Sequence, residues 1–349
     1  MSRRYLILLA SLVCVLMALS GLNGIRPTAA QDNTPTSTPA LGSVTPTASP
    51  PYYTSPTPTV TLPPELDKGQ LVFRDGADLY LVNTSGKNRR KIGNSRQFIY
   101  FCPSYSRDGK HIATIGGSLT FELYTTDGFG NGQRPTVKKG DMRTDFPSGS
   151  TTWSPDAKQV AFTGINGGPF YIVGVDGKNL TTINSDGGSF LNLDWSPDGT
   201  TFVGLALDKE GKIGIVTVGA DGQNLKQLVA LPDSDRAITL NTDNYFSRDV
   251  VWPHWSPDGK QIAFASSKDG NLTLYIMDAD GQNLHRVLKN DTASSYAPSW
   301  SPDGQYLVFT SDRDIQRGIY TVKLSGDEIH LVTNVFTGGC SSWQPTPTP

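Results

Sequence analysis

The chain has 349 residues, with 30 basic and 32 acidic side chains and a formal charge of −2. This length allows one large all-β domain or two smaller domains. The near balance of charge excludes the strongly basic surface that a phosphate backbone requires, so no nucleic-acid partner is expected.

Residues 1–30 have the pattern of a secretory signal peptide. Ser2-Arg3-Arg4 provide positive charge, Tyr5–Leu19 form an apolar run of 15 residues, and Thr28-Ala29-Ala30 supply small residues for cleavage. The run is shorter than the about 20 residues that usually span a bilayer. An uncleaved anchor is the alternative, and it would be the only contact with a membrane. Without this segment 27 basic and 32 acidic residues remain, a charge of about −5. The mature protein is therefore expected in the periplasm, at the cell surface or secreted.

Residues 31–66 repeat Thr-Pro and Ser-Pro steps, as in Thr34-Pro35 and Thr57-Pro58. Proline removes backbone hydrogen-bond donors and favours extended geometry, so such a stretch cannot build a packed core. We expect a disordered linker here and a similar tail at 345–349. The folded domain is predicted to span residues 67–344.

That domain repeats a short motif whose best copy is Trp255-Ser256-Pro257-Asp258-Gly259. The motif recurs at Trp195, Trp300 and, less completely, at Trp153 and Tyr105. Trp343 keeps only its start. Successive aromatic positions lie 48, 42, 60, 45 and 43 residues apart. Ser-Pro-Asp-Gly suits a type I turn, because proline fixes φ at the second position and glycine fits the fourth.

Four strands can be assigned within each repeat. The aromatic residue ends the first strand, a second follows the turn, as in 261–264, and a third lies at 274–276. A further tight turn precedes the fourth strand, and it recurs at Ser85-Gly86, Asp127-Gly128, Asp176-Gly177, Asp221-Gly222, Asp280-Gly281 and Ser325-Gly326. Asp-Gly between apolar runs is a strong hairpin signal. Four short strands in 42–60 residues predict a β-propeller blade.

The two ends of the domain carry complementary halves of one repeat. Residues 70–73 match a second strand without a first, whereas Trp343 ends a first strand without a second. If the C-terminal strand completes the first blade, the fold is an all-β, six-bladed propeller of four-stranded antiparallel blades. A solenoid or two sandwiches would not explain these half-repeats. Closure also removes exposed sheet edges.

The repeats resemble the TolB-type (WD40-like) propeller family over about residues 67–345. The resemblance rests on Trp-Ser-Pro-Asp-Gly, the strand that follows, the second Asp-Gly turn and the connection Thr310-Ser311-Asp312-Arg313-Asp314. It implies a propeller that recruits proteins, peptides or glycans outside the cytoplasm. Fold similarity alone is weak support for function.

A search for catalytic motifs finds neither Gly-x-Ser-x-Gly, nor His-Glu-x-x-His, nor a phosphate-binding loop. The histidines fall at three different strand positions, so we expect them to be solvated rather than metal ligands. No cofactor or metal is predicted. We expect a non-catalytic, monomeric binding module. The alternatives are a lyase or hydrolase that uses carboxylates at the channel mouth on a carbohydrate, and a purely structural surface module.

Two blades are lengthened between the fourth strand and the next first strand, at 130–150 and 231–250. Loops held by a rigid scaffold often carry binding residues, and Arg and Tyr are favoured interface anchors. We therefore expect a partner-binding rim formed by Arg143, Asp145, Phe146, Arg236, Tyr245, Phe246 and Arg248. Solvated loops without a partner are the alternative. The expected partner is an envelope or extracellular protein, a peptide or a glycan.

Cys102 and Cys340 each stand three residues before a repeat aromatic, in adjacent blades. In a six-fold ring, adjacent equivalent points are separated by a distance equal to their radius. A disulfide needs a Cα separation near 5.5 Å, so both residues would have to lie near the axis. We predict a Cys102–Cys340 disulfide across the seam, with two buried thiols as the alternative.

Overall fold

The computed structural model describes residues 69–93, 99–117, 121–137, 147–164, 168–184, 189–208, 210–235, 251–289, 291–314, 317–336 and 339–345. All of them lie within one compact unit, Pro58–Pro349. The expected signal segment, the Pro/Thr/Ser-rich linker and most of the tail lie outside the described residues.

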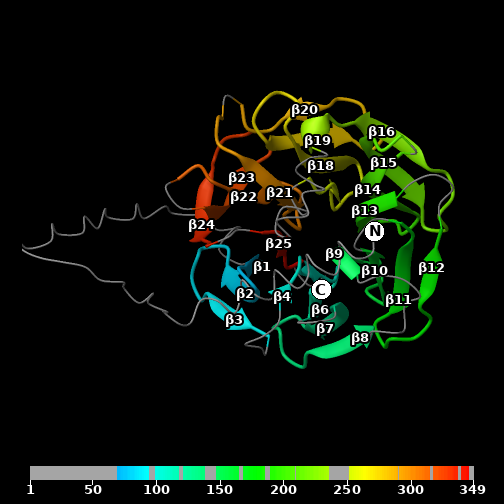
Figure 1. Ribbon diagram of the computed structural model, residues 1–349. Coiled ribbons are helices and arrows are strands. Elements are labelled where there is room, and N and C mark those ends of the chain that lie inside the picture. The colour runs from blue at the N-terminus through cyan, green and yellow to red at the C-terminus, as the bar shows by residue number, and fades with distance from the viewer. Residues whose placement is uncertain are drawn as a thin grey trace, which may run out of the picture. The chain divides into compact units, whose positions relative to one another are not determined.

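The strands form six antiparallel sheets, which are arranged as blades around a common axis (Figure 1). Blade 1 contains β25 (Ser341–Trp343), β1 (Gln70–Asp75), β2 (Asp78–Asn83) and β3 (Arg90–Ile92). Blade 2 contains β4 (Ile99–Tyr100), β5 (Ser104–Tyr105), β6 (His111–Gly117), β7 (Phe121–Asp127) and β8 (Arg134–Val137). In this blade β4 and β5 both pair with β6, so they act as one interrupted first strand.

The other four blades follow in chain order, each with its four strands adjacent in sequence. Blade 3 contains β9 (Pro147–Trp153), β10 (Gln159–Gly164), β11 (Phe170–Gly174) and β12 (Thr181–Ile183). Blade 4 contains β13 (Ser189–Trp195), β14 (Thr201–Leu207), β15 (Ile213–Gly219) and β16 (Lys226–Ala230). Blade 5 contains β17 (His254–Trp255), β18 (Gln261–Ser266), β19 (Thr273–Asp278) and β20 (His285–Arg286). Blade 6 contains β21 (Ser295–Trp300), β22 (Tyr306–Ser311), β23 (Gly318–Lys323) and β24 (His330–Asn334).

The C-terminal strand closes the ring as the sequence predicted. β25 pairs with β1 in antiparallel register, with Trp343 opposite Leu71. Beyond the strand, the N–H of Gln344 donates to the carbonyl of Gln70 (2.8 Å). The first strands of neighbouring blades contact one another in an unbroken circle, through β25, β5, β9, β13, β17 and β21. The six-bladed, closed propeller is thus confirmed.

The hydrophobic core is divided into clusters that lie between neighbouring blades. Six of these clusters contain one repeat aromatic each: Tyr105, Trp153, Trp195, Trp255, Trp300 and Trp343. Trp255, for example, packs with Val203 and Ile215 of blade 4 as well as with Ile262 of its own blade. The repeated aromatic residue is therefore the side chain that joins each blade to the one before it.

The turns between third and fourth strands pack against the outer strand of the preceding blade, and this requires glycine. Gly177 has φ of 81°, and a Cβ at this position would lie 2.7 Å from the carbonyl oxygen of Thr136. In blade 2 the equivalent residue is Gly130 (φ 78°) rather than the expected Gly128. The turn has the same length as in blade 3, since the N–H of Gly130 donates to Asp127 O (2.9 Å) as the N–H of Gly177 donates to Gly174 O (2.8 Å). Asp127 therefore stands at the start of the turn, where its carboxylate accepts the N–H groups of Phe129 and Asn131.

Candidate functional site: an axial pocket

The first strands surround a pocket of about 380 Å³ on the axis of the ring. Its walls are formed by the last residues of these strands, and its mouth by the turns that follow, including Pro257 and Pro302. We call it the axial pocket. Its volume lies within the range of small-molecule sites.

The turns at the mouth are held by a repeated hydrogen-bond pattern. The hydroxyl of Ser256 donates to Asp258 Oδ1 (2.7 Å), which also accepts the N–H of Lys260 (3.1 Å). The N–H of Gln261 donates in turn to Ser256 Oγ (2.9 Å). The Ser-to-Asp bond recurs in the other turns, in the pairs Ser106–Asp108, Ser154–Asp156, Ser196–Asp198 and Ser301–Asp303. The motif therefore fixes the rim of the axial pocket at five points.

The residue directly before each repeat aromatic faces the axis. These six residues, which we call the polar ring, are Ser104, Thr152, Asp194, His254, Ser299 and Ser342. Several of them accept the backbone N–H of the aromatic residue in the next blade. Thr152 Oγ1 accepts the N–H of Trp195 (3.0 Å), and Ser342 Oγ accepts that of Tyr105 (3.1 Å). The innermost strand is a sheet edge, and these side chains satisfy donors that no further strand can reach.

Asp194 joins three blades through its carboxylate. Oδ1 accepts the hydroxyl of Thr152 (2.8 Å) and Oδ2 accepts the N–H of Trp255 (2.8 Å). Burial by itself would raise the pKa of Asp194. Bonding and Coulombic interaction with His254, the positive charge of Arg107, and the Trp255 N–H outweigh burial and hold the pKa of Asp194 below its usual value. The carboxylate is thus kept ionised, and both of its oxygens already accept hydrogen bonds from the protein.

His254 is the other unusual member of the polar ring. Its Nδ1 lies 3.5 Å from Asp194 Oδ2, and its ring stacks on Trp252 at a centroid distance of 5.0 Å. The side chain is only 21% exposed. The expectation that the histidines are solvated is therefore wrong for His254, because the ring geometry brings a carboxylate from the neighbouring blade beside it.

Arg107 extends over the mouth of the axial pocket from blade 2. One Nη2 hydrogen is donated to the carbonyl oxygen of Trp195 in blade 4 (2.9 Å), so the side chain reaches past blade 3. Four of the corresponding turns have proline at this position: Pro155, Pro197, Pro257 and Pro302. Arg107 thus places a positive charge at a position that is an uncharged proline in those four turns.

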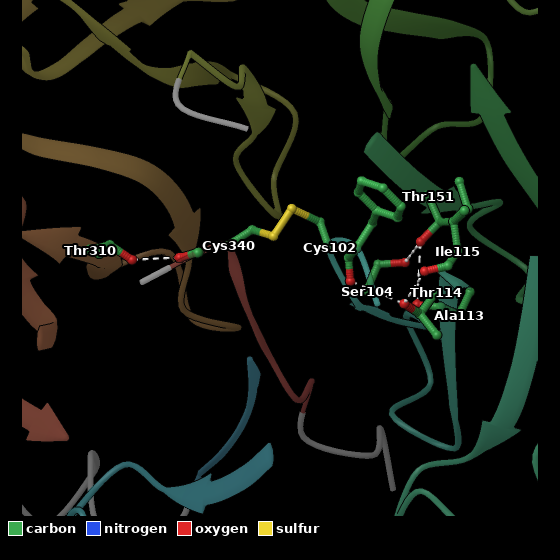
Figure 2. The surroundings of a disulfide bond; sticks show 10 residues. Cys102, Ser104, Ala113, Thr114, Ile115, Thr151, Thr310 and Cys340 are labelled. Carbon is green, nitrogen blue, oxygen red and sulfur yellow. Dashed lines mark hydrogen bonds between the residues drawn. A yellow bond between two sulfur atoms is a disulfide. The ribbon is translucent and has the colours of Figure 1, made fainter. Parts of the chain in front are cut away.

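The floor of the pocket is a buried cluster formed by Cys102, Trp252, Ala297 and Cys340, each at most 3% exposed. Cys102 and Cys340 form the predicted disulfide, with a Cα separation of 5.3 Å (Figure 2). Phe101, beside Cys102, is held to β6 by a bond from its N–H to Ile115 O (2.8 Å). Both cysteines lie three residues upstream of the mouth, about 10 Å along an extended strand.

The expected partner-binding rim cannot be placed in the same way. Arg143, Asp145, Phe146, Arg236, Tyr245, Phe246 and Arg248 all lie outside the described residues. The interval 130–150 is a shorter insert than expected, because β8 begins at Arg134 and β9 begins at Pro147. β8 pairs with β7 and β9 pairs with β10, so both ends of the interval belong to blades 2 and 3.

Asp194 and Arg107 were not singled out in the sequence analysis, although each departs from the residue type that most repeats have at its position. Aligned on the aromatic residue, four blades have Ser or Thr before it, whereas two have Asp194 and His254. Aligned on the turn, Arg107 replaces proline. In both cases the informative feature is a departure from the repeat.

Two further properties concern only the part of the chain that the structure describes. No helix within it has the length and apolar character needed to cross a membrane. Nor do three His, Cys, Asp or Glu side chains gather there at a point where they could share a metal ion.

The closed ring of six blades around the axial pocket defines the chain as a β-propeller. Residues 242–347 match the family model of the TolB beta propeller domain, which confirms the resemblance found in the repeats. The fold is similar to that of TolB from Acinetobacter baumannii, with a TM-score of 0.59 and 20% identity. That similarity covers 80% of this chain and 67% of the other.

Curated relatives match shorter segments. A segment of 67 residues is 32% identical to the Tol-Pal system protein TolB of Xanthomonas campestris, and covers 19% of this chain and 15% of that protein. A segment of 153 residues is 27% identical to the uncharacterized protein Atu1656 of Agrobacterium fabrum, and covers 41% and 47% respectively. The matched segments thus span less than half the length of these relatives.

Proposed function

We propose that this chain is a non-catalytic module that binds a protein partner outside the cytoplasm. The observation that carries the proposal is the state of Asp194, the carboxylate that lines the axial pocket. Both of its oxygens accept hydrogen bonds from the protein itself, and they hold the first strands together. General acid–base catalysis needs a group free to exchange a proton with a substrate, so the geometry of Asp194 favours a structural role.

Export is supported by two independent features. The first 30 residues have the charge and apolar pattern of a signal peptide. The Cys102–Cys340 disulfide suits an oxidising compartment, since cytosolic thiols are normally kept reduced. The similarity to the Tol-Pal system protein TolB supports an envelope protein as the partner.

The proposed contact surface is the rim formed by Arg143, Asp145, Phe146, Arg236, Tyr245, Phe246 and Arg248. The described residues at the ends of both inserts are anchored in the core. Val137 and Ser150 flank the first insert and are each 1% exposed. Rigidly held ends reduce the entropy lost when a loop binds a partner.

The second insert has an additional anchor at Asp235, which is fully buried. Its carboxylate accepts the hydroxyls of Ser266 (2.5 Å) and Ser267 (2.6 Å) and the N–H of Ser267 (2.8 Å). At the other end of the insert, Val251 is also fully buried. These contacts fix where the segment that contains Tyr245 and Phe246 leaves and rejoins the scaffold.

The test is capture of partners from an envelope extract by the immobilised protein, followed by affinity measurement with the purified partner. Alanine variants of Arg143, Tyr245 and Phe246 should each weaken binding, and the aromatic anchors by about 2 kcal/mol or more. Phe129→Ala is the matched control, because Phe129 is 59% exposed in a turn at the opposite end of the blades. Unchanged capture by the insert variants would contradict the proposed surface. Turnover of a glycan or peptide by the purified protein would contradict the non-catalytic assignment.

A further inference from the structure

Several hydrogen-bond acceptors that line the axial pocket are already used within the protein. Both oxygens of Asp194 are occupied. The carbonyl of Ser104 accepts the indole N–H of Trp153 (3.1 Å), and that of His254 accepts the indole N–H of Trp300 (3.0 Å). These three groups are therefore engaged before a ligand reaches the mouth.

The guanidinium of Arg107 is a strong hydrogen-bond donor at the mouth. It carries five N–H groups, of which one is donated to Trp195 O. Among the residues that the structure describes, no carboxylate lies within ion-pair distance of it, although its charge also helps to lower the pKa of Asp194. The bond to Trp195 O fixes the side chain over the pocket, so the positive charge is held there before any ligand arrives.

The turn itself does not require arginine at position 107. The hydroxyl of Ser106 still donates to Asp108 Oδ1 (2.6 Å), as in the proline-containing turns. Proline at this position would favour the same turn by fixing φ. The departure from the repeat therefore serves something other than folding of the turn.

We propose that the axial pocket binds a carboxylate group, with Arg107 as its charged partner. The planar fork of an arginine matches the two oxygens of a carboxylate. The hydroxyl of Ser342, whose oxygen already accepts Tyr105 N–H, is left to donate to the ligand. Pro257 and Pro302 at the mouth and Trp300 in the wall are apolar parts of the same pocket, and they suit an apolar group attached to the carboxylate. A peptide C-terminus and a small organic acid share this chemistry.

This site is separate from the proposed partner-binding rim. Arg107 lies in a turn between first and second strands, whereas both inserts join a fourth strand to the next first strand. In an antiparallel blade these two kinds of connection lie at opposite ends. Loss of carboxylate binding and loss of partner binding are therefore distinguishable by separate variants.

The experiment titrates the protein with a short apolar tripeptide as the free acid, with the same tripeptide as its C-terminal amide, and with acetate. Binding is followed by calorimetry and by tryptophan fluorescence, since Trp252, Trp255 and Trp300 line the pocket. The free acid should bind at least about tenfold more tightly than the amide, the effect of one charge-assisted hydrogen bond. Binding of acetate without the peptide would identify a small free acid as the source of the carboxylate.

Arg107→Pro restores the sequence of the other turns and should keep the fold, as checked by thermal unfolding. We expect this variant to lose at least about tenfold in affinity for the free acid. Arg107→Ala gives the same test without the proline ring. Lys260→Ala removes one positive charge from the equivalent turn of blade 5, where the side chain is 80% exposed, and should leave affinity unchanged. Equal affinity for acid and amide, full binding by Arg107→Pro, tighter binding of inorganic phosphate, or no binding by any probe would overturn the proposal.

Discussion

The backbone N–H of Trp255 donates to Asp194 Oδ2 across 2.8 Å, and this bond joins the first strands of blades 4 and 5. In two other places the same donor position is satisfied by a hydroxyl, from Thr152 and from Ser342. No further strand lies on the axial side of the innermost strands to accept the N–H groups that point toward the axis. Side chains of the polar ring therefore complete the inner edge of the propeller.

Replacing Asp194 by valine should destabilise the protein by about 1–3 kcal/mol, because the Trp255 N–H is then left without its acceptor. Asp194→Thr has the same shape as valine but restores the hydroxyl found at position 152, so it should lose less. Chemical denaturation of the two variants measures the difference. Equal stability of the valine and threonine variants would show that the acceptor is unimportant.

Removal of the disulfide in Cys102→Ser/Cys340→Ser should destabilise the folded state by about 2–5 kcal/mol. The bond closes a loop between residues 238 apart in sequence, and it restricts the unfolded chain strongly. Thermal unfolding with and without reductant provides the check. Reductant should lower the Tm of the wild type and leave that of the double variant unchanged. A wild type insensitive to complete reduction would contradict this role.

Trp343→Ala should cost about 3–5 kcal/mol, since this 6% exposed indole lies in the cluster that joins blade 6 to blade 1. Trp343→Phe keeps an aromatic ring and should cost less. Backbone hydrogen exchange in β1 should become faster in the alanine variant, because Leu71 of β1 pairs with Trp343. Unchanged exchange at β1 would argue against closure by the C-terminal strand.

The turn aspartates predict a loss of stability in acid. The hydroxyls of Ser154, Ser196 and Ser256 lower the pKa of Asp156, Asp198 and Asp258, respectively, in the folded state. Each carboxylate therefore adds stability that is fully present above the unfolded-state pKa of about 3.9 and is lost as pH falls through the lower folded-state value.

Thermal unfolding between neutral pH and about pH 2 tests this contribution, in the range where aspartate titrates. Asn at these three positions keeps the oxygen that accepts the serine hydroxyl but does not titrate. The triple Asp→Asn variant should show a shallower fall of Tm in acid than the wild type. Identical acid profiles would assign the loss to other carboxylates.

The fold was predictable because each blade is encoded locally. The turn at Ser256–Gly259 and the strand after it depend on residues within about ten positions, and the motif recurs around the chain. The half-repeats at Leu71 and Trp343 showed how the ring closes. The disulfide was also predictable, because Cys102 and Cys340 occupy equivalent positions before Tyr105 and Trp343. In a ring, equivalent positions of adjacent blades lie close together when they are near the axis.

The axial pocket was not predictable in this way, since it has no local code. Arg107, Asp194 and His254 are far apart in sequence and occupy positions that most repeats fill with Pro, Ser or Thr. Only the packing of six blades around one axis brings them together. The repeat by itself determined the number, order and closure of the blades, because those follow from short-range turn and strand chemistry. The tertiary structure decided which side chains share the axis and which hydrogen bonds join them, because those depend on distances between different blades.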